Sequence, residues 1–238
     1  VVPFQPSELM KLAAPMMVAW FMHDRRLPPQ FLPVVVVTLI VLVPALIIAE
    51  QPDLGTAMLV LAGGALAILL AGVSARVIAS VGILGLAAVP VLWAYMRDYQ
   101  RARVFMFLNP ESDPLGAGYN TIQAKIAIGS GGLFGKGWMN GTQAHLEFLP
   151  ERSTDFIFAV MGEEFGLLGL CLLIVLYVAL VGRGLYIASQ AQDTFTRLLA
   201  GTLSLTFFFY VFGNAGMVSG LLRIVGVPLP LVSAGGTS

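Results

Sequence analysis

The feature that most constrains this chain is a series of uncharged apolar stretches, each about as long as a bilayer core is thick. A transmembrane helix needs about 20 consecutive apolar residues. Such stretches recur along the sequence, and of its 238 residues 58% are hydrophobic and only 11% are charged. Soluble domains carry roughly 25% charged residues. The sequence therefore predicts an all-α, polytopic transmembrane helix bundle.

Six membrane spans are expected, and together they form a single transmembrane domain over residues 1–238. The expected spans are residues 5–22, 32–49, 54–73, 77–96, 155–182 and 198–220. The largest connection, residues 97–154, is expected to be an extracytoplasmic loop. Both ends of the chain fall within patterned sequence, so we expect an internal piece of a longer membrane protein.

Arginine in the short connections predicts how the bundle is oriented. Arginine occurs in "HDRR" after the first span, at residue 76 before the fourth, and at residues 183 and 197 between the last two. These connections fall on one side in a six-span count, and short arginine-containing loops are typically cytoplasmic. The extracytoplasmic side then holds the turn "EQPDLG", the long loop and the C-terminal stretch "GVPLPLVSAGG".

Ionisable residues collect on that extracytoplasmic side. In "QPSELMK", Glu8 and Lys11 are three residues apart, so they share one helix face. They either form an ion pair where the helix begins or face a polar cavity, and the two roles are compatible. In "EQPDLG", Asp53 is placed to cap the next helix, although capping alone does not explain Glu50 beside it.

The long loop is basic and contains a candidate surface helix. Tyr119, Ile122 and Ile126 form one stripe with Lys125 beside it, which predicts a short amphipathic helix lying in the membrane interface. The glycine-rich run "IGSGGLFGKGW" follows and lacks the residues of a P-loop. We expect a flexible segment there.

The basic residues of this loop are candidates to hold an anionic group such as a pyrophosphate. The alternative is a solvated basic loop attracted to lipid headgroups. The candidate residues are Arg101, Arg103, Lys125 and Lys136.

The stretch "LPERSTDFIFAVMGEEFG" places several carboxylates at the start of the fifth span. "STD" before an apolar run is a helix N-cap signal, so Asp155 is expected to cap this helix. On an ideal helix Glu163 lies about 80° around from Asp155 and Glu164 about 180°. The two glutamates therefore do not share a partner with Asp155, and at least one must point into the bundle or meet a positive group.

These motifs, in this order, resemble the SEDS family of bacterial cell-wall polymerases, and its rod-shape branch more than its division branch. The matching segments are "QPSELMKL", "QPDLGTA", "DYQRARV", "FLNPESDPLGAGYN", "IGSGGLFGKGW", "LPERSTDFIFAV" and "GVPLPLVSAGG". The resemblance covers essentially the whole chain. It implies a fold of roughly ten transmembrane helices, of which this chain would supply the fourth to the ninth.

The resemblance implies a peptidoglycan glycosyltransferase that polymerises lipid II, an undecaprenyl-pyrophosphate-linked disaccharide-peptide, for cell elongation and rod shape. It would work at the outer face of the bacterial cytoplasmic membrane. Asp155 is implied as the catalytic carboxylate. Residues expected to line the same cavity are Glu8, Lys11, Asp53, Glu151 and Arg152.

Further expectations concern a metal cofactor, the binding partners and two other possible functions. Asp155 would act either as a base or by organising a divalent cation such as Mg²⁺ or Mn²⁺, and no residue spacing demands a metal. The implied partners are a class B penicillin-binding transpeptidase and other membrane proteins of the elongation complex, besides the lipid bilayer. The zero net charge gives no sign of a nucleic-acid partner. Two other functions stay open: a lipid II translocase (flippase), and a non-catalytic scaffold for the transpeptidase.

Overall fold

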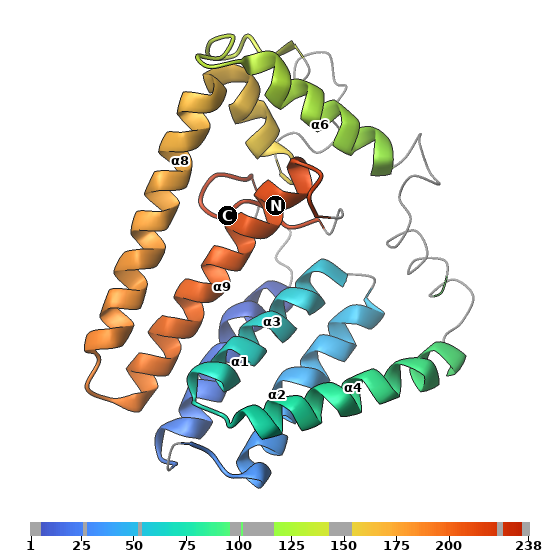
Figure 1. Ribbon diagram of the computed structural model, residues 1–238, viewed down its shortest axis with the longest axis vertical. Helices are drawn as coiled ribbons and strands as arrows, with labels where there is room; N and C mark the ends of the chain where they lie inside the picture. The colour runs from blue at the N-terminus through green and yellow to red at the C-terminus, as the bar shows by residue number, and fades with distance from the viewer. Residues whose placement is uncertain are drawn as a thin grey trace.

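The computed structural model describes residues 6–25, 28–51, 54–95, 101, 117–142, 154–222 and 226–234. None of these residues is in a strand, which confirms the all-α prediction. Figure 1 shows the arrangement of the helices. They are α1 (Pro6–His23), α2 (Phe31–Glu50), α3 (Leu54–Leu70), α4 (Ala75–Tyr95), α6 (Ala117–Gly131), α8 (Ile157–Gln190) and α9 (Thr194–Val218).

Three of the helices, α2, α8 and α9, are long and apolar enough to cross a membrane, and α1 and α3 contain shorter apolar stretches. The chain is therefore an integral membrane protein. Each predicted span overlaps one helix, and the span boundaries themselves stay predictions. α8 continues past residue 182 to Gln190, so only Ala191, Gln192 and Asp193 connect it to α9.

One cluster of buried side chains lies where α1, α2, α3 and α9 pack together. Val18, Met22, Val37, Val60 and Leu198 are almost fully buried there. The glycine at position 64 lets α2 approach α3 closely, because a Cβ at that position would overlap the side chain of a valine on α2. This cluster fixes the end of α9 that lies next to α8's last turn (Figure 1).

A second cluster joins α6, α8 and the other end of α9. Ala124 and Ala127 of α6 are fully buried, and small residues allow that helix to lie close to α8. Tyr177, Met217 and Leu229 belong to the same cluster. Because α9 takes part in both clusters, it connects the four-helix bundle to the region around the start of α8.

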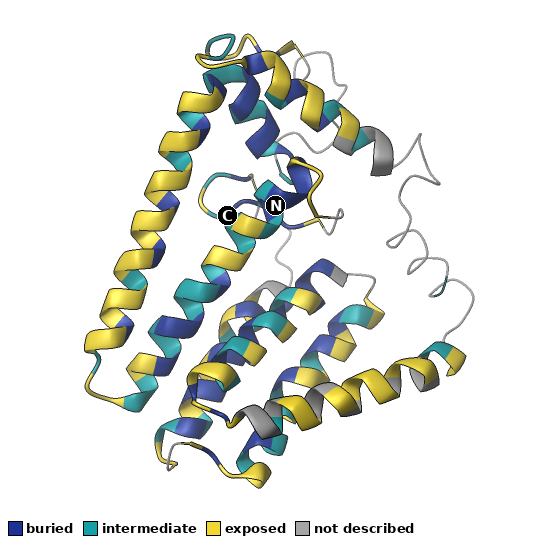
Figure 2. Ribbon diagram, in the orientation of Figure 1, coloured by how far each residue is buried: buried dark blue, intermediate teal, exposed yellow. Residues whose placement is uncertain are grey.

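The remaining helix, α4, packs little against the rest. None of its described side chains is buried, and Figure 2 shows most of the described part of this helix as exposed. The outward faces of α8 and α9 are also rich in exposed leucine, valine and phenylalanine. A lipid bilayer is the solvent that suits such faces.

Candidate active site

The residue implied to be catalytic, Asp155, lies on a turn that precedes α8. Residues 154–156 form this turn, and α8 begins at Ile157 with Phe156 in the N-cap position. The carbonyl of Phe156 accepts hydrogen bonds from the backbone N–H of Ala159 at 2.9 Å and of Val160 at 3.3 Å. The N-cap position is therefore occupied by Phe156 and not by Asp155, because the helix begins one residue further along the chain than expected.

Two side chains hold this turn outside the helix. Asn214 of α9 donates from Nδ2 to the backbone carbonyl of Asp155 at 2.8 Å. Ser233 donates from Oγ to the carbonyl of Thr154 at 2.6 Å. Both carbonyls are thus bonded to residues distant in the sequence, which explains why the turn does not continue the helix.

The segment 226–234, after α9, folds back onto this turn. Asn214 also donates from Nδ2 to the carbonyl of Val227 at 2.7 Å. The Ser233 hydroxyl accepts from the backbone N–H of Leu229 at 2.7 Å, and the Tyr177 hydroxyl donates to the carbonyl of Pro230 at 2.6 Å. The segment is therefore fastened to α8, to α9 and to the turn that carries Asp155.

Gly226 begins this segment right beside the Asp155 carboxylate. Its φ is +68°, and a Cβ built on it would lie 3.3 Å from Asp155 Oδ2. Both the conformation and the space favour glycine at this position. The sequence placed "GVPLPLVSAGG" on the extracytoplasmic side and among the family motifs, but not in the site.

Lys11 approaches the same region from α1. It is 8% exposed, and its Nζ lies 5.4 Å from the centroid of the Tyr210 ring on α9. Tyr210 and Asn214 are four residues apart, so they share one face of α9. Lys11 and the backbone of Asp155 thus each contact a residue on that face of α9, and their place in a common cavity stays a prediction.

Other predicted site residues lie elsewhere or outside the described residues. The Arg101 guanidinium donates to the carbonyls of Trp93 and Ala94 at 3.1–3.2 Å, where it caps the last turn of α4. Lys125 is exposed on α6. The pyrophosphate contacts proposed for both stay predictions. Asp53, Arg103, Glu151 and Arg152 lie outside the described residues, as does the side chain of Glu8.

The glycine-rich segment is ordered, and the expectation of a flexible loop is wrong. α8 is broken at Gly166, which has φ 67° and ψ −166°. The break frees backbone groups of α8, and residues 132–137 bind them. The bonds run from Lys136 N to Glu163 O, from Gly137 N to Glu164 O, from Leu167 N to Gly132 O and from Leu168 N to Leu133 O, at 2.9–3.1 Å. We call residues 131–137 together with 163–168 the glycine clamp.

Close backbone approach explains the glycines of the clamp. A Cβ on Gly131, Gly135 or Gly166 would overlap backbone atoms of the facing segment. The φ of Gly166, combined with its extended ψ, is in a region that is essentially accessible only to glycine. The sequence "GSGGLFGKG" therefore encodes a docking surface for the broken helix.

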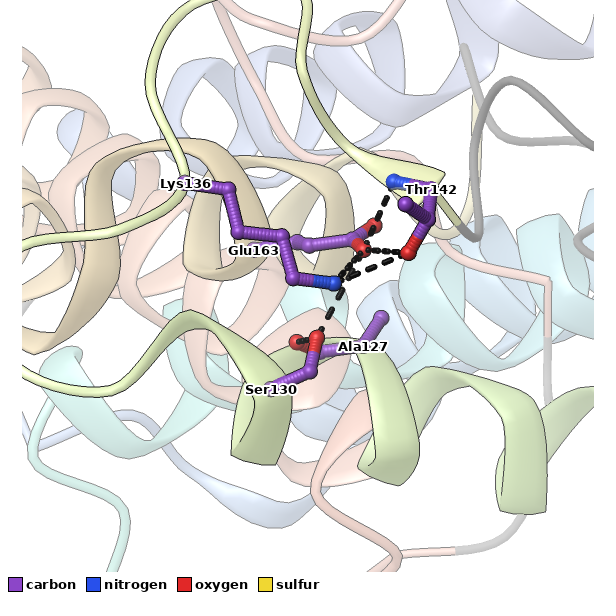
Figure 3. A network of polar contacts seen from close by, with 5 residues as sticks. All are labelled: Ala127, Ser130, Lys136, Thr142 and Glu163. Carbon is purple, nitrogen blue, oxygen red and sulfur yellow. Dashed lines mark hydrogen bonds and ion pairs between the residues drawn. The ribbon is translucent and has the colours of Figure 1, made fainter.

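A buried ion pair lies at the centre of the clamp (Figure 3). Glu163 is fully buried, and its Oε1 lies 2.6 Å from Lys136 Nζ. Oε1 also accepts from the backbone N–H of Thr142 at 2.8 Å and from its hydroxyl at 2.9 Å. The Ser130 hydroxyl is 3.5 Å from Oε1 and donates instead to the Ala127 carbonyl at 2.9 Å. The inference that one of the two glutamates turns inward to meet a positive group is confirmed.

A segment of the chain connects the region of the glycine clamp to the turn that carries Asp155. Thr142 is held by Glu163, and Thr154 is held by Ser233. Residues 143–153 join these two anchors.

A divalent-cation site does not form from the residues that the structure describes. Within these ranges, no three His, Cys, Asp or Glu side chains converge on one point. Whether Asp155 acts as a base or by organising a divalent cation stays a prediction.

Comparison with known proteins identifies the family. The family FTSW_RODA_SPOVE, described as cell cycle protein, matches residues 1–238. The chain is 56% identical over its whole length to the peptidoglycan glycosyltransferase MrdB of Escherichia coli (strain K12). The chain spans 65% of the length of that relative.

Solved structures show the same fold. A chain of a peptidoglycan synthase complex that coordinates polymerization and crosslinking matches with a TM-score of 0.76 and 34% identity, over 98% of this chain and 65% of that chain. The rod shape determining protein RodA of Thermus thermophilus matches with a TM-score of 0.61 and 28% identity, over 98% and 60% of the two chains. The predicted resemblance to the SEDS family and its rod-shape branch is confirmed. This chain belongs to the FTSW_RODA_SPOVE family of cell cycle proteins.

Proposed function

We propose that this chain carries the active site of a peptidoglycan glycosyltransferase, which polymerises lipid II into glycan strands for cell elongation. The observation that supports this most is the setting of Asp155. Its backbone is held by Asn214 on a turn outside the helix, and its carboxylate lies beside a glycine. The similarity to MrdB, which is named a peptidoglycan glycosyltransferase, points to the same activity.

Glycosyl transfer from lipid II requires a base for the attacking hydroxyl and a positive group that stabilises the negative charge of the departing pyrophosphate. A hydroxyl of the acceptor sugar attacks the anomeric carbon of the donor. The bond from that carbon to the pyrophosphate oxygen breaks, and undecaprenyl pyrophosphate leaves with the electron pair. Asp155 accepts the proton of the attacking hydroxyl as general base, a role that typically accelerates a reaction by about 10²–10⁴-fold.

Lys11 is the described cation that best suits the departing pyrophosphate. It is almost buried, and its Nζ lies over the ring of Tyr210, which shares a face of α9 with Asn214. A positive charge in a site with little water strongly stabilises a departing anion. Lys136, which pairs with Glu163, also remains a proposed pyrophosphate contact. Glu8, Asp53, Arg103, Glu151 and Arg152 remain proposed cavity residues, and Arg101 and Lys125 remain proposed pyrophosphate contacts.

The proposed location is the bacterial cytoplasmic membrane, with Asp155 on its extracytoplasmic side. The proposed partners are lipid II and a class B penicillin-binding transpeptidase. A similar chain occurs in a synthase complex that coordinates polymerization with crosslinking, which supports the second partner.

The test is glycan synthesis by the full-length protein in vesicles that contain labelled lipid II. We expect polymer from the wild type and at least a 100-fold lower rate from Asp155→Asn. Asp24→Asn, a change of an exposed aspartate after α1, is the matched control and should polymerise normally.

Each alternative gives a different result in these vesicles. Lipid II that crosses the membrane without forming polymer would show a translocase. Normal growth of cells that carry only Asp155→Asn would show a scaffold. The same assay with a chelator, followed by Mg²⁺ or Mn²⁺, tests dependence on a divalent cation.

A further inference from the structure

Asn214 occupies a position between the catalytic turn and the segment that returns to it. The side chain is fully buried in α9. Its Nδ2 donates one hydrogen bond to the Asp155 carbonyl at 2.8 Å and another to the Val227 carbonyl at 2.7 Å. Both amide hydrogens are therefore used, and each bond reaches a backbone group that flanks the Asp155 carboxylate.

The chemistry of its partners determines how this amide is oriented. Both partners are carbonyl oxygens, which only accept hydrogen bonds, so the NH₂ group and not the oxygen must face them. Its own Oδ1 is buried and accepts no hydrogen bond from the described residues. An unpaired buried acceptor is unfavourable. The two donated bonds are thus what makes an amide suitable at this position.

The two bonds restrict the space around the Asp155 carboxylate. One fixes the backbone of residue 155, and the other fixes residue 227, next to Gly226. A Cβ built on Gly226 would lie 3.3 Å from Asp155 Oδ2. A shift of either segment would move the carboxylate relative to the reacting sugar or crowd it.

We propose that Asn214 is a positioning residue for glycosyl transfer, which holds the Asp155 carboxylate in place by tying residue 155 to residue 227. This role rests on the glycosyltransferase function proposed above. Asn214 does not touch substrate in this assignment. It acts through the backbone of Asp155, and a misplacement of about 1 Å lowers a reaction rate by about 100-fold.

The experiment measures initial rates of polymerisation by the full-length protein at several lipid II concentrations. Asn214→Leu removes both donors while keeping a side chain of similar branched shape. Asn214→Ala is measured beside it in case the larger leucine prevents folding. Rates are divided by the amount of monodisperse protein, at a temperature well below the melting temperature of each variant. We expect kcat to fall by about 10–100-fold while KM for lipid II stays within about 3-fold.

The matched control is Thr206→Val on the same helix. Thr206 is also buried, and its hydroxyl makes no hydrogen bond among the described residues. Valine has nearly the same shape, so this variant should keep the wild-type kcat. It separates the loss of the two donated bonds from any general effect of changing the interior of α9.

Each outcome decides the question. A wild-type kcat in folded Asn214→Leu or Asn214→Ala would show that the residue is only structural. A raised KM with unchanged kcat would show a role in substrate binding, and would also overturn the proposal. If the wild-type protein itself makes no polymer, the proposed glycosyltransferase function is wrong, and the proposed role of Asn214 is wrong with it.

Discussion

Lys136 Nζ lies 2.6 Å from Oε1 of the fully buried Glu163, and this pair joins the loop after α6 to the short first part of α8. The carboxylate also receives both the N–H and the hydroxyl of Thr142. A buried charge is stable only when it is paired and hydrogen-bonded. The pair therefore makes the loop and the broken helix mutually dependent.

Removal of one partner of this pair should destabilise the protein. Glu163→Ala leaves Lys136 without its counter-charge, and Lys136→Ala leaves a carboxylate buried without its cation. Loss of one partner of a buried ion pair costs about 3–5 kcal/mol, which corresponds to a melting temperature lower by roughly 6–20 °C in a protein of this size. Thermal unfolding of the purified protein in detergent would measure this.

Glu164→Gln is the control for this prediction. Glu164 is the next residue along α8, and it forms no ion pair within the described parts of the chain. Its melting temperature should stay within about 2 °C of the wild type. If Glu163→Gln and Glu164→Gln lowered the melting temperature equally, the ion pair between Lys136 and Glu163 would not be what stabilises this region.

Gly166→Ala should prevent correct folding of the clamp. Alanine cannot readily adopt φ 67° with ψ −166°, and its Cβ would overlap the backbone of residues 133 and 135. We expect a large loss of monodisperse protein in size-exclusion chromatography. Gly182→Ala, in the same helix but with no atom within 4 Å of the added Cβ, should be neutral or slightly stabilising because alanine favours helix.

Gly226→Ala should impair glycan synthesis more than it impairs stability. The added Cβ would lie 3.3 Å from Asp155 Oδ2, so the carboxylate or the segment must shift. Gly72→Ala gives a matched comparison, because Gly72 has a similar φ of +76° but no atom near its Cβ. Both variants should lose similar stability from backbone strain, about 1 kcal/mol. Equal polymerisation rates in the two variants would argue against crowding of Asp155.

Asp193 should make the stability of α9 depend on pH. Its carboxylate caps α9 by accepting from Thr196 N at 2.7 Å, and this hydrogen bond lowers the pKa of Asp193 below its ordinary value. A carboxyl whose pKa is lower in the folded state stabilises the protein above its unfolded pKa, near 4. That contribution disappears as the pH falls through the folded pKa.

The variant Asp193→Asn isolates this effect. Asparagine is also a good N-cap, so the melting temperature of this variant near pH 7 should be close to that of the wild type. The loss of stability that Asp193 causes as the pH falls below about 4 should be absent in the variant. Asp193→Ala should melt lower than both at pH 7. An Asp193→Asn curve parallel to the wild type throughout would contradict the assignment.

The sequence was sufficient for the fold class, because uncharged apolar stretches long enough to cross a bilayer leave few alternatives. The family itself also followed from the sequence, through motifs such as "QPSELMK" and "TDFIFA". The inward turn of a glutamate followed from helix geometry alone, because Glu163 and Glu164 point to different sides.

Contacts between distant segments could not be derived in this way. Asp155 carries a strong N-cap signal, but Asn214 and Ser233 compete for the backbone of its turn, and both lie far along the sequence. The glycine-rich run was read as flexible because composition does not reveal a docking partner. Its partner exists only because Gly166, at the end of another motif, breaks α8.

The break in α8 also separates the part of the helix that can cross a membrane from the short part that leads to the Asp155 turn. The part of α8 after Gly166 is about 36 Å long, which alone exceeds the roughly 30 Å of the hydrocarbon core. The part before it is thus not needed for crossing, and the polar backbone at the break is covered by the loop and not by lipid. The distance between Asp155 and the glycine clamp is therefore set by the short first part of α8. A change in bilayer thickness that tilts the part after Gly166 would leave this distance unaltered.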